Sequence, residues 1–167
     1  KSLFAEIFRH SSGLTHTLRK MSNYGVLGAY LPEFGQVVGQ MQHDLFHVYT
    51  VDAHLLFVVR NLRRFAVEKH AEEFPYLSNL IKDLDKPFRL YMAGFLHDIA
   101  KGSGQDHSIL GEDIALKICD RHGFSKDDSS FVAWLVRHHL LMSWTAQKQD
   151  ITDPEVISTF AETMGDM

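Results

Sequence analysis

Histidine is the residue type in this sequence that could do chemistry, with 11 copies in 167 residues. Imidazole is the commonest transition-metal ligand in proteins and the usual proton carrier near neutral pH. The strongest local pattern is His97 followed by Asp98, because a neutral imidazole beside a carboxylate gives a mixed nitrogen and oxygen ligand set that suits Zn, Mn or Fe. Such a pair is common by chance, so it indicates a metal site only if other histidines converge on it.

Further histidines stand next to apolar helical patterns elsewhere in the chain. His54 lies beside the apolar stripe of one predicted helix, and His107 stands at the predicted start of another. His138 and His139 end the apolar face of a third. Taken singly, each is better explained as a core or surface histidine with backbone partners. Packing gives no reason for all of them to lie beside buried faces, so together they predict a cluster of metal ligands.

Other candidate residues carry less weight. His43 and His47 have the i, i+4 spacing of some zinc hydrolases but lack the accompanying Glu, so a non-ligand role is favoured, although His47 could border the site. Lys101 follows Asp98 by three residues and could balance the charge of a phosphate. A solvated lysine at a helix end explains it nearly as well. Cys119 lies on an apolar stripe and is predicted to be core rather than a nucleophile.

The elements that must position these residues all have helical periodicity. Caps are predicted at Asp106, at Ser125 with Asp128, and at Asp153 before Pro154. No segment alternates between apolar and polar residues, so the predicted class is all-α, a helical bundle. The glycine-rich stretch 25–39 is predicted to form short turns. The helical patterns cover residues 3–21 with a weak point at 11–13, and then 46–65, 77–84, 88–99, 107–122, 126–142 and 154–164.

The overall composition narrows the class of protein. Hydrophobic residues make up 45% of the chain, which predicts a packed core. A net charge of -4 without a long basic run argues against nucleic acid as a partner. No apolar stretch approaches the ~18 residues that span a membrane, and the single cysteine fits a reducing cytoplasm. Because the chain opens on Lys1 without Met, we expect it to be part of a longer protein.

The order of the histidines and the strings between them resemble a known family. His54, then His97-Asp98, then His107, and then the pair at 138–139 resemble the HD superfamily of phosphohydrolases. The strings Tyr-Leu-Pro-Glu-Phe-Gly at 30–35 and His-Val-Tyr-Thr-Val-Asp at 47–52 resemble, more specifically, the central domain of the bifunctional uridylyltransferase/uridylyl-removing enzymes. The resemblance covers essentially the whole chain.

This resemblance implies an HD-domain helical bundle over residues 46–167, preceded by a helical connector at 1–45. It implies metal-dependent hydrolysis that removes UMP from a tyrosine of the PII nitrogen-signalling protein. A nucleotidyltransferase domain and glutamine-sensing ACT domains would belong to the same full-length chain. Two alternatives stay open, namely an HD nucleotidase or phosphodiesterase that acts on free nucleotides, and a non-catalytic domain that docks PII.

The resemblance also implies roles for individual residues. Asp98 would bind metal and help to deprotonate water, and Lys101 would counter the phosphate charge, which makes these two the catalytic candidates. The expected cofactor is a divalent metal, Mn or Mg first, with Zn or Fe possible. The superfamily pattern closes with one more Asp, which is expected beyond Met167, because Asp153 is predicted to cap a helix and Asp150 lacks the expected context. The implied metal ligands are His54, His97, Asp98, His107, His138 and His139.

Overall fold

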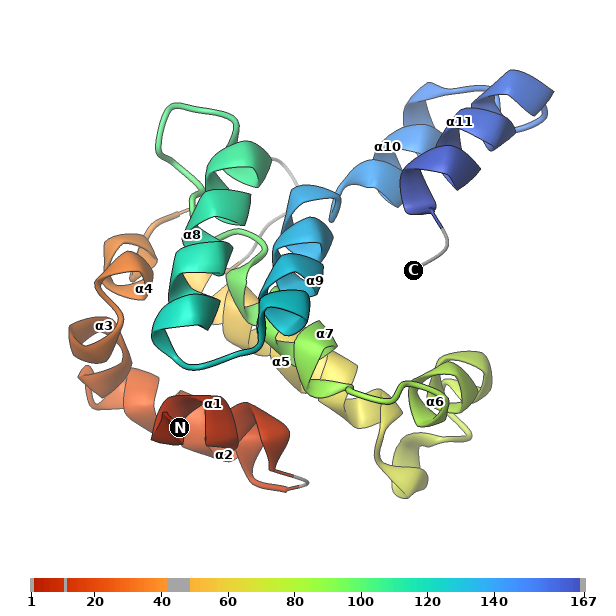
Figure 1. The fold of residues 1–167 in the computed structure, drawn as a ribbon. Coiled ribbons are helices and arrows are strands. Elements are labelled where there is room, and N and C mark those ends of the chain that lie inside the picture. Colours follow the sequence, from red (N-terminus) through yellow and green to blue (C-terminus); the bar gives the residue numbers. More distant parts are fainter. Residues whose placement is uncertain (1, 11, 42–48, 166–167) are drawn as a thin grey trace. The chain divides into compact units, whose positions relative to one another are not determined.

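Helices are the regular elements of the computed structural model, which describes residues 2–10, 12–41 and 49–165 (Figure 1). Within these ranges the one β-type feature is an isolated antiparallel bridge between Met41 and Thr50, so the all-α prediction is confirmed. No helix in the described ranges is long and apolar enough to cross a membrane. The chain divides into two compact units, residues 1–137 and 138–167, and we describe each by itself.

The first unit holds most of the helices, and the second holds the last two. In the first unit these are α1 (Leu3–Arg9), α2 (Leu14–Asn23), α3 (Val26–Tyr30), α4 (Pro32–Val37), α5 (Val51–Phe65), the 3₁₀ helix η1 (Glu68–His70), α6 (Pro75–Lys82), α7 (Phe88–Leu96), α8 (His107–Arg121) and α9 (Lys126–Arg137). In the second unit they are α10 (Leu141–Lys148) and α11 (Pro154–Met164).

The predicted helix caps are confirmed. Asp106 and Asp153 each accept, through a side-chain oxygen, the backbone N–H two residues further along the chain. Ser125 Oγ accepts the backbone N–H of Asp128 at 3.1 Å. Gly123 follows α8 with a φ of 75°, a backbone conformation that favours glycine. Local sequence therefore determines where α8, α9 and α11 begin and where α8 ends.

In two segments the number of helices differs from the prediction. The helix expected over 126–142 is two helices, because α9 ends at Arg137 and α10 begins at Leu141. The turn between them contains neither Gly nor Pro, so nothing local marks it. The glycine-rich stretch 25–39 holds α3 and α4 rather than turns alone. Glycine serves there for close approach, since a Cβ on Gly35 would lie 2.9 Å from the carbonyl oxygen of Gly28.

The long helix predicted from Phe46 begins later. Helix α5 starts at Val51, and Tyr49 and Thr50 precede it outside the helix. Residues 42–48, which include His43 and His47, lie outside the described residues. The predicted domain boundary between residues 45 and 46 falls in the same stretch and stays a prediction.

Helix α7 forms the centre of the core of the first unit, with α5 beside it (Figure 1). Residues 91–96 of α7 are all buried, and the ring of Phe95 lies 5.6 Å from that of Phe8 and 5.4 Å from that of Phe34. Gly94 faces α5, where an added Cβ would lie 2.5 Å from Leu62 Cδ1 and 3.3 Å from Val58 Cγ1. The missing side chain at 94 lets the two helices approach closely.

A buried ion-pair cluster fixes α9 to the start of α7. Asp128 is buried and accepts hydrogen bonds from Arg89 and, at 3.2 Å, from Lys86. Burial raises the pKa of Asp128, but hydrogen bonds from Ser125, Arg89 and Lys86 outweigh it and hold the pKa below its usual value. The cluster therefore stabilises the packing of α9 against α7, the helix that His97 directly follows.

Candidate metal centre

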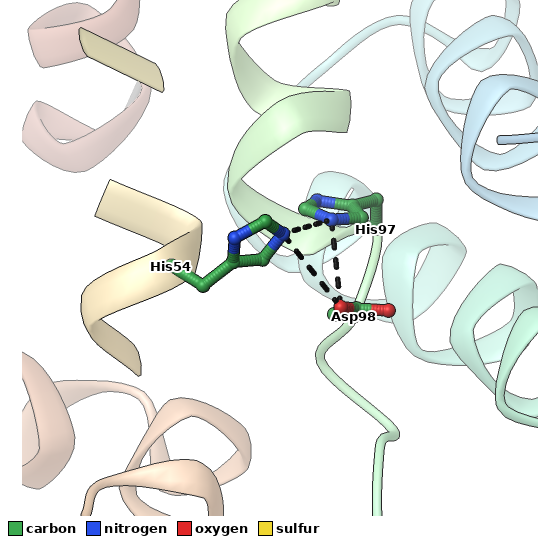
Figure 2. A group of neighbouring side chains, drawn as sticks. All are labelled: His54, His97 and Asp98. Carbon is green, nitrogen blue, oxygen red and sulfur yellow. Dashed lines mark hydrogen bonds and ion pairs between the residues drawn. The ribbon is translucent and has the colours of Figure 1, made fainter. Parts of the chain in front are cut away.

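His54, His97 and Asp98 come together where the first turn of α5 meets the end of α7 (Figure 2). His97 directly follows the last residue of α7, and Asp98 comes next. The two imidazole Nε2 atoms of His54 and His97 are 3.2 Å apart. Asp98 Oδ2 lies 3.6 Å from His97 Nε2 and 3.9 Å from His54 Nε2. Residues 43 positions apart in sequence thus present three potential ligand atoms to one point.

These separations match what one metal ion requires. Zinc is bound at about 2.0–2.2 Å by imidazole nitrogen and carboxylate oxygen. A triangle with the three observed edges has a point that lies about 2.1 Å from every corner, by elementary geometry. An ion of this size therefore fits among the three atoms almost without movement of the side chains.

A backbone contact orients the His97 ring. His97 Nδ1 lies 2.9 Å from the carbonyl oxygen of Gly94, an acceptor to which the ring N–H donates. In a neutral imidazole only one nitrogen carries hydrogen, so Nε2 presents a lone pair towards His54 and Asp98. Metal-binding histidines are commonly oriented by a hydrogen bond of this kind from the other ring nitrogen.

Asp98 is a buried residue, only 3% exposed, and each of its two carboxylate oxygens has a nitrogen-bearing side chain nearby. Lys101 Nζ lies 3.1 Å from Oδ2, and His107 Nε2 lies 3.4 Å from Oδ1. The cap at Asp106 holds His107 in the first position of α8. A buried carboxylate is costly unless it is paired or bound to a metal, and this one has partners suited to both.

A family model described as "HD domain" matches residues 51–163, more than half of the chain and including all of the centre described above. The chain belongs to the HD domain family. HD domains are metal-dependent phosphohydrolase domains, so the predicted class of enzyme is confirmed at the level of the family. A second model, described as "Uridylyltransferase GlnD third domain", matches residues 1–30.

Curated relatives align with this chain over nearly its whole length. The bifunctional uridylyltransferase/uridylyl-removing enzyme of Nitrosococcus oceani is 59% identical over 166 residues, which are 99% of this chain and 19% of that protein. The enzyme of the same name from Chromobacterium violaceum is 60% identical over 162 residues, 97% of this chain and 19% of that protein. This chain thus spans 19% of the length of each of these two relatives.

The remaining predicted ligands belong to the second unit. His138 and His139 are its first two residues, so their roles as ligands stay predictions. The two aspartates considered as a final ligand are engaged locally, because Asp150 accepts from the N–H and the hydroxyl of Thr152 while Asp153 caps α11. The HD domain therefore uses both carboxylates to shape its own backbone.

The prediction that Cys119 is a core residue is confirmed. Its side chain is fully buried in α8, and burial raises the pKa of the thiol to about 12. A thiol with such a pKa carries almost no thiolate at neutral pH and is a poor nucleophile.

Sequence reasoning missed two glycines that shape the HD domain site. Gly94 permits the close approach of α5 and α7, and an isolated Gly inside an apolar helical pattern was the available signal. Gly102 has a φ of 81°, and the Gln40 side chain occupies the place where its Cβ would be. The Gln40 carbonyl also accepts the N–H of Val51 at 2.9 Å. Gln40 thereby links the loop after Asp98 to the start of α5.

Proposed function

We propose that this HD domain hydrolyses the phosphodiester between UMP and a tyrosine of the PII signalling protein, and so releases UMP. The observation that carries the proposal is the convergence of His54, His97 and Asp98, with ligand atoms 3.2–3.9 Å apart. The substrate is inferred from the relatives, whose printed name includes uridylyl-removing activity. The first of their two named activities, uridylyl transfer, belongs in this proposal to another domain of the full-length protein.

The proposed metal ligands are His54, His97 and Asp98, with His107, His138 and His139 as further ligands implied by the family pattern. When bound, a divalent ion would supply a nucleophile by lowering the pKa of water towards ~7. The two imidazole nitrogens suit Fe or Zn and the carboxylate suits Mn, whereas Mg keeps mainly oxygen ligands and water. Among the ions expected from the sequence, we therefore propose Mn before Mg.

The side chains around this point have distinct tasks in the proposed reaction. Water adds to phosphorus, the bond from phosphorus to the tyrosine oxygen breaks, and its electron pair leaves on the phenolate, which then takes a proton. Asp98 orients the attacking water and accepts its proton. Lys101 is held by Asp98 at 3.1 Å and is partly exposed, so its ammonium group can counter the charge that develops on the phosphate oxygens.

A double substitution in the full-length protein tests the assignment. His97→Ala with Asp98→Ala should abolish the release of UMP from uridylylated PII, because it removes two of the three ligand atoms that converge at this point. Attachment of UMP to PII by the same preparation should be unchanged, which shows that the protein is folded. His16→Ala, at an exposed histidine of α2, is the matched control and should leave both activities intact. Unchanged release in the double variant would refute the proposal.

The same protein distinguishes the two alternatives. Hydrolysis of free nucleotide esters without release of UMP from PII would assign the domain to small-molecule substrates. A transition-metal content below about one-tenth of an equivalent, with no activity restored by Mn, would assign it to docking instead, because hydrolysis by this site depends on a bound ion.

A further inference from the structure

Two exposed aromatic rings lie in the first half of α5 and just before it. The rings of Tyr49 and Phe57 are stacked, with centroids 5.5 Å apart and an interplanar angle of 22°. Tyr49 is 49% exposed and Phe57 is 38% exposed, so solvent reaches both. The guanidinium carbon of Arg60 lies 5.9 Å from the centre of the Phe57 ring. The pair is therefore a short aromatic stack, with a cation near its Phe57 ring.

This aromatic pair borders the metal centre. Phe57 follows His54 by three residues on α5, and side chains at this spacing are neighbours on one side of a helix, with Cβ atoms about 5–6 Å apart. The core face of α5 is formed by other residues, Val51, Leu55 and Val59, all of which are buried. Packing of the helix therefore does not account for the placement of the two rings.

We propose that the Tyr49–Phe57 pair is the binding site for the pyrimidine base of the nucleotidyl group, an inference that rests on the proposed function. Bases stack on exposed aromatic side chains in many nucleotide-binding proteins. A nucleotide whose phosphate lies at Asp98 must place its base close by, and the stack includes Phe57, the helical neighbour of His54. Arg60 offers hydrogen-bond donors to the carbonyl oxygens of a pyrimidine.

The size of the surface favours a base over a protein partner. Phe57 and Arg60 are the exposed residues of α5, so the apolar surface there amounts to about two rings. A stable protein interface buries about 800 Å² on each partner. A base extends such a stack by one ring, and the tyrosine of the substrate protein is the competing occupant that the experiment must exclude.

The first experiment compares two substrates with the same leaving group in the full-length protein. One is uridine 5′-(p-nitrophenyl phosphate), and the other is methyl p-nitrophenyl phosphate, which has no base. Phe57→Ala should raise KM for the nucleotidyl ester about tenfold, the change that 1.4 kcal/mol of lost stacking produces. It should leave KM for the methyl ester unchanged, and Phe57→Tyr should restore the wild-type value because it keeps the ring.

A matched control and a clear contrary result accompany these variants. Tyr76→Ala removes an exposed aromatic ring, 72% accessible, from α6 and should change neither ester. An equal change for both esters in Phe57→Ala would show that the ring only supports the fold, and no change for either would show that the base binds elsewhere. Both results overturn the proposal. The proposal would also be overturned if Phe57→Ala weakened the binding of uridylylated PII but changed neither ester. The rings would then bind the tyrosine of the substrate protein.

A second experiment does not depend on hydrolysis. 5-Iodouridine 5′-monophosphate is irradiated with the full-length protein, and the cross-link is located by peptide mass spectrometry. We expect a cross-link at Tyr49 or Phe57, which both lie in the tryptic peptide that ends at Arg60. Cross-links confined to other residues would overturn the proposal. If wild-type protein hydrolyses neither ester but the cross-link forms, the proposed function fails while the base-binding site stands.

Discussion

The approach of α5 to α7 at Gly94 sets the distance between the proposed ligands His54 and His97, and a substitution there tests the geometry without replacing either of them. An added Cβ at position 94 would lie 2.5 Å from Leu62 Cδ1 and 3.3 Å from Val58 Cγ1. Carbon atoms in contact lie about 3.5–4.0 Å apart. Leu62 must therefore retreat by about 1 Å for any side chain to be accommodated.

The size of the effect depends on which side chain is added. In Gly94→Ala the terminal methyl group of Leu62 can turn away, and the helix gains about 0.5–1 kcal/mol because Ala replaces Gly. The net change in unfolding free energy should then stay within about 1 kcal/mol. In Gly94→Val the branched side chain also meets Val58, and overpacking of this kind costs about 1–3 kcal/mol. Helix separation by about 1 Å should reduce UMP release about 100-fold.

The assay measures UMP release from uridylylated PII across a Mn titration, with UMP attachment as the internal control. Leu62→Ala removes the clashing atom, so adding it to Gly94→Val should recover about tenfold in activity if the two positions are coupled. Release by Gly94→Val within about twofold of wild type, or a further loss on adding Leu62→Ala, would refute the reasoning.

Three further outcomes follow from the first unit. Asp128→Asn should lower the unfolding free energy by about 2 kcal/mol at pH 7, because it weakens a buried charged hydrogen bond with Arg89. Since the pKa of Asp128 is lowered on folding, its contribution is present above the usual carboxyl range and is lost as pH falls through the lowered pKa, so variant and wild-type stabilities should converge in acid. Cys119, with a pKa raised to about 12, should resist thiol reagents at pH 8 until denaturant is added, and labelling of the folded protein would contradict this. Asp106→Ala removes a helix cap, so hydrogen exchange at the Ser108 amide should accelerate, while an unchanged rate would show that the cap is dispensable.

Local signals in the sequence were enough for the fold class and for the starts of α8, α9 and α11. Side chains at Asp106, Ser125 and Asp153 cap helices by bonding backbone groups a few residues away, and such contacts depend on sequence neighbours alone. The break between α9 and α10 has no such local signal, and it was missed for that reason. Likewise, the N–H of Val51, the first residue of α5, donates to the carbonyl of Gln40, which is not one of its near neighbours in the sequence.

The sequence by itself determined which residues could bind a metal, since residue type sets the chemistry of an imidazole or a carboxylate. It also determined the order of these residues along the chain, which resembles that of the HD superfamily. Only the tertiary structure decided that His54 Nε2 lies 3.2 Å from His97 Nε2, because that distance depends on how closely α5 and α7 pack at Gly94. The same holds for the Tyr49–Phe57 pair, whose rings are eight residues apart and became a surface only through folding. Distances across a fold are set by the packing of many side chains at once, and no local pattern encodes them.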